Sequence, residues 1–325
     1  MFDEKEERVM RVRVGTFNLF QYSKPPYAYY RKKARFSSLQ WQEKEGWIVA
    51  QLQKMRCDIV GFQEVFSADA LASLVKSVGL EYFATVEEAK VSERDSLKYV
   101  TTTVALASKY PIISLSTPSL SLEAMKRYGV EERLWGFARQ PICATLLLPS
   151  GEEIVVYVAH LKSNRLNQFE PLFHAEHTFK EKEERVMKRL EGGGGSALRQ
   201  RVCEASSLRH AIEQNKERMT LLLCDLNDTC HSFTYTLLSS EKQKEERFED
   251  SFCVAHKRMI PREPTHYFMG KGQVLDYLFF NEGALKKRDI EVCRYEVFGE
   301  HLQKRKSSLL QSDHAQVVVT LRFKA

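Results

Sequence analysis

Short apolar runs and longer amphipathic segments alternate along this chain. Val12–Phe20 and Asp58–Phe66 are two such runs, and between them Ser37–Lys54 carries apolar residues at helical spacing. This order predicts strand, helix, strand. A second helix is predicted over Ala197–Gln214, so strands dominate, with helices between some of them. Further short strands, several rich in β-branched residues, are predicted over Val104–Ser108, Ile142–Leu148, Ile154–Ala159, Thr220–Cys224, Val274–Phe280 and Val317–Phe323.

The segment 165–196 breaks this pattern. It is aromatic and histidine-containing at first, then carries a charged run, and then has four consecutive glycines at Gly192–Gly195. Because four consecutive glycines stabilise neither a helix nor a strand, we expect a flexible loop insertion over 165–196. An engineered linker in place of a trimmed segment would give the same pattern at Gly192–Ser196.

Polar side chains of a few kinds stand at the ends of the apolar runs. Many strands that each contribute one or two groups at a common edge are typical of an active site. Carboxylates, amides and two imidazoles, with no obvious Ser or Cys nucleophile, suit hard cations and phosphate oxygens. The pattern therefore predicts a metal-assisted phosphoesterase. The residues are Asn18, Glu64, His160, Asp225 with Asn227, Asp276, and Asp313 with His314.

Each motif alone also has a structural explanation. Asn18 is disfavoured in a strand and has either a turn role or a ligand role. Glu64 lies among apolar neighbours and needs a counter-charge, which a metal or an arginine would supply. Asp225 and Asn227 have the spacing of a water-orienting carboxylate beside an amide, although chance turns share it. The coincidence of six such motifs favours function over these separate explanations.

Two further motifs extend the candidate site. His160 opens a cluster of donors that could bind phosphate oxygens, and strand alternation puts His160 and Lys162 on the same face. His314 needs a carboxylate to fix its tautomer and raise its basicity, and Asp276 is available for that. The donors that follow His160 are Lys162, Ser163 and Asn164.

Length, charge and cysteine content indicate the number of domains, the charge of a partner and the cellular compartment. The chain has 325 residues and 43% hydrophobic content, and because the motifs run from Asn18 to His314 we expect a single domain over 1–325. A net charge of +6 favours a polyanionic partner only weakly. Seven cysteines without a CxxC pair indicate buried free thiols in a reducing compartment. No apolar stretch approaches the roughly eighteen residues of a membrane span, so we expect a cytoplasmic protein.

Taken in order, these motifs resemble the endonuclease/exonuclease/phosphatase superfamily over nearly the whole chain. The resemblance implies an α/β four-layer sandwich, with two mixed β-sheets packed face to face and helices on both outer sides. It implies Mg²⁺ or Mn²⁺ held by Glu64, with Asn18 nearby and Asp313 contributing. Asp225 would orient or deprotonate the attacking water, Asn227 would hold water or phosphate, and His160 and His314 would stabilise the transition state.

Three residues are candidate contacts to the substrate phosphate, Arg139 from the resemblance, and Lys162 and Asn164 from their chemistry as donors, since the sequence after His160 departs from the pattern of the better-known members. Arg139 stands where many members carry arginine, and Lys162 and Asn164 follow His160. Surface ion pairs explain Arg139 and Lys162 equally well. Thr265-His266, before the Asp276 strand, is a further candidate of this kind.

Three functions compete at this point. The first is a nuclease, because the basic and aromatic stretch Tyr22–Phe36 could meet a sugar-phosphate backbone. The second is a phosphatase or phosphodiesterase acting on a small-molecule or lipid phosphoester of the inositol phosphate or sphingomyelin type. The third is a binding module without catalysis, which would predict a broken site. The sequence leaves substrate identity, endo or exo action, metal number and oligomeric state open.

Overall fold

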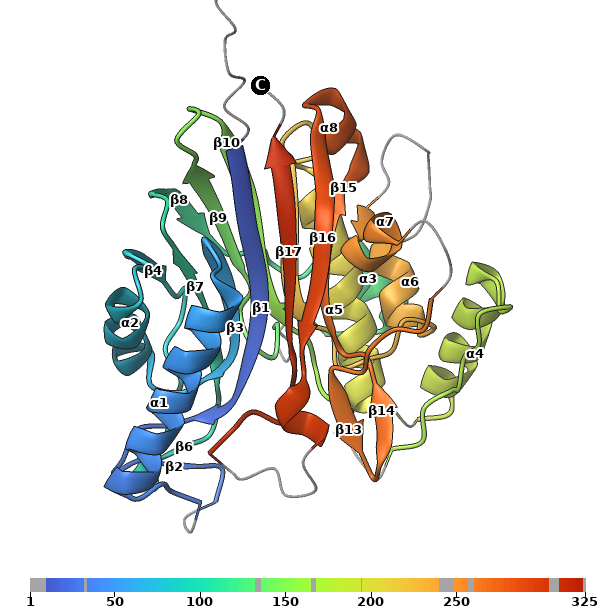
Figure 1. Cartoon of the computed structure of the whole chain (residues 1–325). Helices are drawn as coiled ribbons and strands as arrows, with labels where there is room; N and C mark the ends of the chain where they lie inside the picture. Colours follow the sequence, from blue (N-terminus) through green and yellow to red (C-terminus); the bar gives the residue numbers. More distant parts are fainter. Residues whose placement is uncertain are drawn as a thin grey trace, which may run out of the picture.

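The computed structural model describes residues 10–31, 34–131, 136–164, 168–193, 195–239, 248–256, 260–303 and 310–323. Two six-stranded sheets packed face to face form its centre (Figure 1). The first sheet has the order β16-β17-β1-β3-β7-β4, in which β1 lies antiparallel to β17 and parallel to β3. Its strands are β1 (Met10–Tyr22), β3 (Ile59–Val65), β4 (Tyr82–Ala84), β7 (Thr103–Ser108), β16 (Ile290–Phe298) and β17 (Gln316–Phe323).

The second sheet has the order β12-β15-β11-β10-β9-β8. Here β10 and β11 are parallel, whereas β11 and β15 are antiparallel. The strands are β8 (Ile112–Ser116), β9 (Ile142–Leu147), β10 (Glu153–His160), β11 (Met219–Asp225), β12 (Phe248–Asp250) and β15 (Asp276–Asn281). Smaller sheets are formed by β2 (Ala28–Tyr29) with β5 (Val91–Ser92) and β6 (Asp95–Tyr99), and by the hairpin β13 (His266–Phe268) and β14 (Lys271–Gln273).

Apolar residues on the facing sides of the two sheets form the main core. Val14 and Val319 of the first sheet belong to one buried cluster with Val156 and Leu221 of the second. Each of these side chains is fully buried, and sequestering such surface from water is the main stabilising contribution to the fold. The sheets therefore face one another across a continuous hydrophobic layer.

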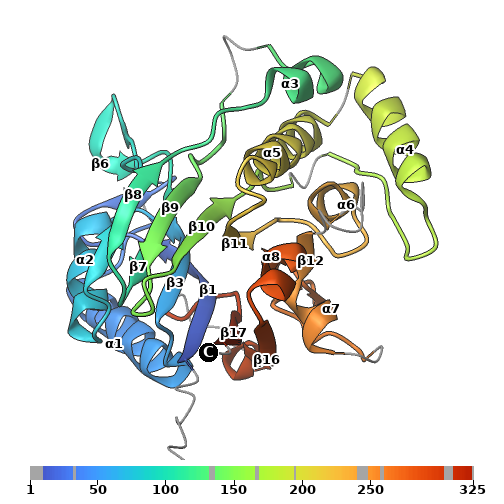
Figure 2. The ribbon, with the colours of Figure 1, turned by 90° about the horizontal axis from the view of Figure 1, so that it is seen from above.

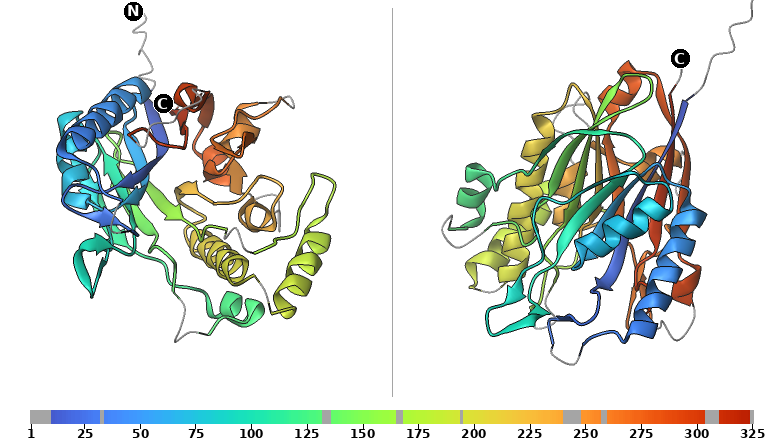
Figure 3. Two further views of the ribbon diagram at one scale, coloured as in Figure 1. Left: turned by 90° about the horizontal axis from the view of Figure 1, so that it is seen from below. Right: turned by 90° about the vertical axis from the view of Figure 1, so that its left-hand side faces the viewer.

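Helices cover the outer faces of both sheets (Figure 2 and Figure 3, left). On the first sheet, Ile48 and Leu52 of a helix pack with Phe17 of β1, and on the second Leu208 packs with Tyr157 of β10. The four-layer α/β sandwich expected from the resemblance is thereby confirmed. The helices are α1 (Ser38–Met55), α2 (Ala68–Ser77), α3 (Leu122–Tyr128), α4 (Phe179–Glu191), α5 (Ser196–Glu213), α6 (Phe233–Ser239), α7 (Ser251–Ala255), α8 (Glu282–Lys287) and a 3-10 helix at Glu300–Gln303.

The loop expected over 165–196 contains a helix, so that expectation is wrong for Phe179–Glu191. Thr178 and Glu181 form a capping box at its start, which satisfies backbone N–H groups that the helix itself leaves unpaired. Val186 and Leu190 are buried one turn apart against α3, α5 and α6. The charged run is therefore an amphipathic helix, and the glycines follow it in the sequence. Residues 165–167 and 194 lie outside the described part.

Two further expectations concerned the burial of the cysteine thiols and the lack of a membrane-spanning segment. All seven cysteines are free, but Cys253 and Cys293 are exposed, so the expectation of buried thiols does not hold for those two. Within the described ranges, every helix is too short or too polar to cross a bilayer.

Candidate active site

Three of the expected residues meet because of strand register at the lower edge of the second sheet in Figure 1. His160 ends β10 and lies opposite Asp225, which ends the parallel strand β11. Asp276 begins β15 and lies opposite Asp225 on the other side. Asp276 was expected inside its strand, and instead it is the first residue, at the same edge as the other two. The second sheet thus delivers an imidazole and two carboxylates side by side.

Asp225 is the centre of the hydrogen-bond network. Its Oδ2 accepts from Nδ2 of Asn18 at 2.9 Å, and its Oδ1 accepts from the backbone N–H of Asn227 at 2.8 Å. Nε2 of His160 lies 3.5 Å from Oδ2, and Nε2 of His314 lies 4.0 Å from it. Since Asn18 comes from β1, the cluster joins the edges of both sheets. The carboxylate has a single orientation fixed by its donors.

The protonation states of Asp225 and His160 follow from their burial. Burial raises the pKa of Asp225 to about 6, with Asp276 adding to the rise and His314 and the two hydrogen bonds opposing it. Burial, together with the charges of Arg139 and His314, lowers the pKa of His160 well below 6.5. At neutral pH the site therefore contains an ionised Asp225 next to a neutral His160.

His314 is positively charged, opposite to the ionised Asp225. Its Nδ1 lies 2.8 Å from Oδ2 of Asp276, the pairing that we expected from the sequence. Burial alone would lower the pKa of His314, but Asp276 and Asp225 outweigh it and hold the pKa well above 6.5. His314 is consequently an imidazolium whose Nε2 is turned toward Asp225 and Asp313. A fixed positive donor of this kind suits a phosphate oxygen.

Glu64 stands at an irregular end of β3. Its φ of 57° lies in the left-handed region, which a non-glycine residue adopts at a cost. Its Oε2 accepts from the backbone N–H of Gln21 at 2.9 Å. Burial and the nearby charge of Asp313 raise the pKa of Glu64 above its ordinary value. A cation between Glu64 and Asp313 would stabilise the ionised form of Glu64.

Several oxygens at the site have acceptor capacity that suits a divalent cation. Asp313 Oδ1 and Asp276 Oδ1 are buried oxygens without a hydrogen-bond partner. Asn18 Oδ1 already accepts from the N–H of Phe20 at 2.9 Å, so it retains one lone pair. Oxygen donors with unused acceptor capacity are what Mg²⁺ or Mn²⁺ takes.

Of the residues expected to contact the substrate, Arg139 lies in the hydrogen-bond network next to His160, whereas Asn164 does not. Arg139 Nη1 donates to the carbonyl of Leu161 at 3.1 Å, and Nδ2 of Asn227 donates to the same carbonyl at 3.0 Å. The Arg139 side chain is also hydrogen-bonded to that of Tyr30. Arg139 and Asn227 are therefore held next to His160. Asn164 is exposed and lies further along the chain, outside this network.

Glu204 was not identified from the sequence. This fully buried residue of α5 accepts the backbone N–H of Ala138 with Oε1 and that of Lys162 with Oε2, each at 2.7 Å. One carboxylate thus fastens the turn before Arg139 to the chain that follows His160. Its only sequence signal is an acid next to the apolar positions of the predicted helix.

Lys44 was also missed, because it reads as an ordinary polar position of a helix. It is fully buried, and its Nζ donates to the carbonyl of Leu19 at 3.0 Å, between the rings of Phe20 and Phe36. Burial lowers its pKa to about 8, while Glu64 and Asp313 oppose this. A positive charge therefore lies behind the two carboxylates.

Comparison with known proteins gives matches in structure only. The sequence matches no protein-family model and no curated protein. The human Nocturnin catalytic domain, solved with a bound sulfate anion, has a TM-score of 0.61 at 15% identity, over 98% of this chain and 97% of that one. An endonuclease/exonuclease/phosphatase from Bacteroides vulgatus gives 0.59 at 16%, over 97% and 100%. Truncated Caenorhabditis elegans TDP2 gives 0.56 at 14%, over 97% and 98%.

These likenesses span almost the whole length of both chains in each pair, and the identity is too low to carry more than the fold. They agree with the two packed sheets. The chain therefore has the fold of the endonuclease/exonuclease/phosphatase superfamily.

Proposed function

We propose that this protein is a divalent-metal-dependent phosphodiesterase that hydrolyses nucleic acid. The observation that carries the proposal is the cluster around Asp225, where an ionised acid, a neutral His160 and a charged His314 meet within hydrogen-bonding or ion-pairing distance. In-line displacement at phosphorus needs an aligned water, charge neutralisation and stabilisation of the leaving group. The cluster contains a group suited to each task.

Each residue then has a defined part. Asp225 accepts a proton from the attacking water as the water oxygen bonds to phosphorus. The opposite phosphorus–oxygen bond to the leaving group breaks, and the leaving oxygen takes up a proton from solvent. Asn18 and the Asn227 N–H keep the Asp225 carboxylate oriented. His314, held by Asp276, donates to a phosphoryl oxygen as negative charge develops there. His160 is neutral, so its ring can hydrogen-bond to the same phosphoryl group without adding a charge.

The cation position belongs to Glu64, Asp313 and Asn18. Mg²⁺ or Mn²⁺ bound there would neutralise charge on the phosphate and polarise the P–O bond. Arg139, Lys162 and Asn164 are proposed to contact the phosphates of the substrate. Arg139 has the strongest support, because its bond to the Leu161 carbonyl holds it next to His160.

A cavity next to Glu64 favours nucleic acid as the substrate. It measures about 590 Å³ and includes Gln21, whose N–H bonds to Glu64. Tyr30 is 46% exposed at this cavity, and Arg31 and Arg35 are exposed around it. An accessible aromatic face can stack on a base while guanidinium groups meet the backbone. Lys32 and Lys33 of the same stretch lie outside the described residues.

Nucleolytic assays test the proposal. Plasmid nicking and digestion of single-stranded DNA and RNA are measured with Mg²⁺, Mn²⁺ or EDTA. We expect metal-dependent cleavage, with a higher KM after Arg31→Ala or Arg35→Ala. Arg11→Ala, an exposed arginine near the start of β1, is the matched control and should leave KM unchanged. No metal-dependent cleavage of any nucleic acid, together with turnover of another phosphoester, would contradict the nuclease assignment.

A second candidate is a phosphatase or phosphodiesterase for small-molecule or lipid phosphoesters. The observation that favours it is the pair Phe169 and Leu172, which are 86% and 81% exposed in the segment between β10 and α4. Exposed apolar side chains of this size can contact an acyl chain. A panel of inositol phosphates and sphingomyelin tests it, and a lower rate on the lipid after Phe169→Ser and Leu172→Ser would support this candidate.

A further inference from the structure

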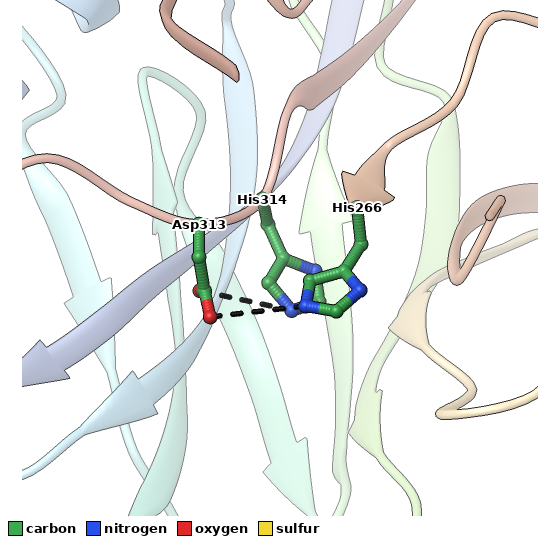
Figure 4. Close-up of side chains that lie close together, drawn as sticks. All are labelled: His266, Asp313 and His314. Atoms are coloured by element: carbon green, nitrogen blue, oxygen red, sulfur yellow. Dashed lines mark ion pairs between the residues drawn. The ribbon is translucent and has the colours of Figure 1, made fainter. Parts of the chain in front are cut away.

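Two imidazoles and one carboxylate lie together at the rim of the active site. They are His266 of β13 and the neighbours Asp313 and His314, which precede β17. Figure 4 shows the Asp313 carboxylate facing both rings. Nε2 of His266 lies 3.8 Å from Oδ2 of Asp313, and Nε2 of His314 lies 3.9 Å from Oδ1. One ligand atom from each residue falls within 4.8 Å of the other two.

The backbone and the neighbouring side chains hold this arrangement. A β-bridge joins His266 to His314, and the N–H of Ala315 donates to the carbonyl of Thr265 at 2.7 Å. The two rings are consequently 4.9 Å apart between centroids. Asp276 binds Nδ1 of His314, which directs Nε2 toward the cluster, and an ion that binds there displaces the Nε2 proton to solvent. A carboxylate behind an imidazole is the usual support of a metal-ligating histidine.

Asp313 also has unused capacity for a ligand, and the cluster can be reached from solvent. Asp313 Oδ1 makes no hydrogen bond although it is shielded from solvent. Asp313 is 35% exposed at its side chain and His266 is 17% exposed, so an ion can enter from solvent and retain a water. A route of entry and an open coordination position are therefore both present.

We propose that His266, Asp313 and His314 form a binding site for a transition-metal dication such as Zn²⁺. Bonds of about 2.0–2.2 Å from zinc to nitrogen and oxygen place tetrahedral ligand atoms roughly 3.3 Å apart. The observed separations of 3.8 and 3.9 Å need only small side-chain rotations to reach that value. Two nitrogen donors favour zinc-like ions over Mg²⁺, which prefers oxygen. This ligand set differs from the oxygen-rich position at Glu64.

One consequence rests on the proposed function. Asp313 and His314 also belong to the phosphodiesterase site, so an ion bound here removes a ligand from the Mg²⁺ position and a donor from the phosphate. Zn²⁺ is then an inhibitor of Mg²⁺-dependent hydrolysis.

Equilibrium dialysis of Zn²⁺ against the whole chain tests the site without reference to activity. The protein is purified without a polyhistidine tag and dialysed in excess Mg²⁺. We expect one Zn²⁺ bound per chain. The Zn²⁺ affinity should be at least about tenfold lower after His266→Ala, and about ten- to a hundredfold lower after Asp276→Asn. His266→Gln is the second variant in case the alanine variant does not fold, as judged by circular dichroism.

Two control variants separate this site from others. His210→Ala, an exposed histidine on α5, and His174→Ala, whose ring lies 5.5 Å from that of His177, should leave the affinity unchanged. Glu64→Gln should abolish Mg²⁺-dependent turnover and retain Zn²⁺ binding, so failure of the phosphodiesterase proposal leaves this test intact. Unchanged Zn²⁺ affinity in both folded His266 variants, or its loss in His174→Ala, would overturn the assignment.

Discussion

Replacing Asp225 with asparagine should stabilise the metal-free protein at about pH 8 but leave it nearly unchanged at about pH 4.5. The reason is the pKa of Asp225, which burial raises from 3.8 to about 6. A group whose pKa is higher in the folded state stabilises the fold fully below its unfolded value and loses that contribution as the pH rises. For Asp225 the loss falls between about 4 and 6.

The magnitude follows from that shift. About two pKa units correspond to about 3 kcal/mol against the folded state at about pH 8, and to about 1 kcal/mol at about pH 4.5. Asparagine removes this cost, but its amide N–H₂ meets that of Asn18, and the lost hydrogen bond costs about 1 kcal/mol at either pH. The variant should therefore be more stable by about 2 kcal/mol at the higher pH and by about zero at the lower.

Urea unfolding in EDTA, followed by circular dichroism at both pH values, measures these differences. Asp289→Asn, an exposed aspartate after α8, is the matched control and should show no such dependence on pH. A gain in unfolding free energy of Asp225→Asn that is equal at both pH values, or larger in acid, would contradict the reasoning. It would show that ionising the buried Asp225 carboxylate does not cost the free energy given above.

Three further outcomes are expected. Glu64→Ala should lower kcat by several orders of magnitude with an unchanged circular dichroism spectrum, because it removes the main cation ligand; a retained rate would exclude that role. Glu204→Gln leaves one acceptor oxygen for two N–H donors, so kcat/KM should fall between about tenfold and a hundredfold through displacement of the residues next to His160. A change in thermal stability without a change in kcat/KM would mean that Glu204 is merely structural. Leu190→Ala should cost about 2–5 kcal/mol of unfolding free energy, whereas the exposed Leu172→Ala should cost less than about 0.5 kcal/mol. Equal small effects in urea unfolding would show that α4 does not pack as described.

Local sequence signals were sufficient where a single element determines the outcome. Ser37 was expected at the start of a helix and is the N-cap of α1, with Gln40 completing a capping box. The apolar run before Asp225 is a fully buried strand. Strand ends could be located from the periodicity, and the polar residues of β1, β10, β11 and β15 at this edge do meet, as they must if the strands share an edge. The pairing of Asp276 with His314 could likewise be expected from their chemistry.

Other features depend on contacts between distant segments. β1 lies between β3 and β17, and no local pattern indicates that the first and last described strands pair. Glu204 and Lys44 resemble solvated helix positions, and only packing against other elements buries them and assigns their partners. His266 joins the site through a backbone bridge to His314. Hydrophobic periodicity records which face of an element is buried, whereas the identity of the buried neighbours, and with it the charge state of each group, is decided by the assembled layers.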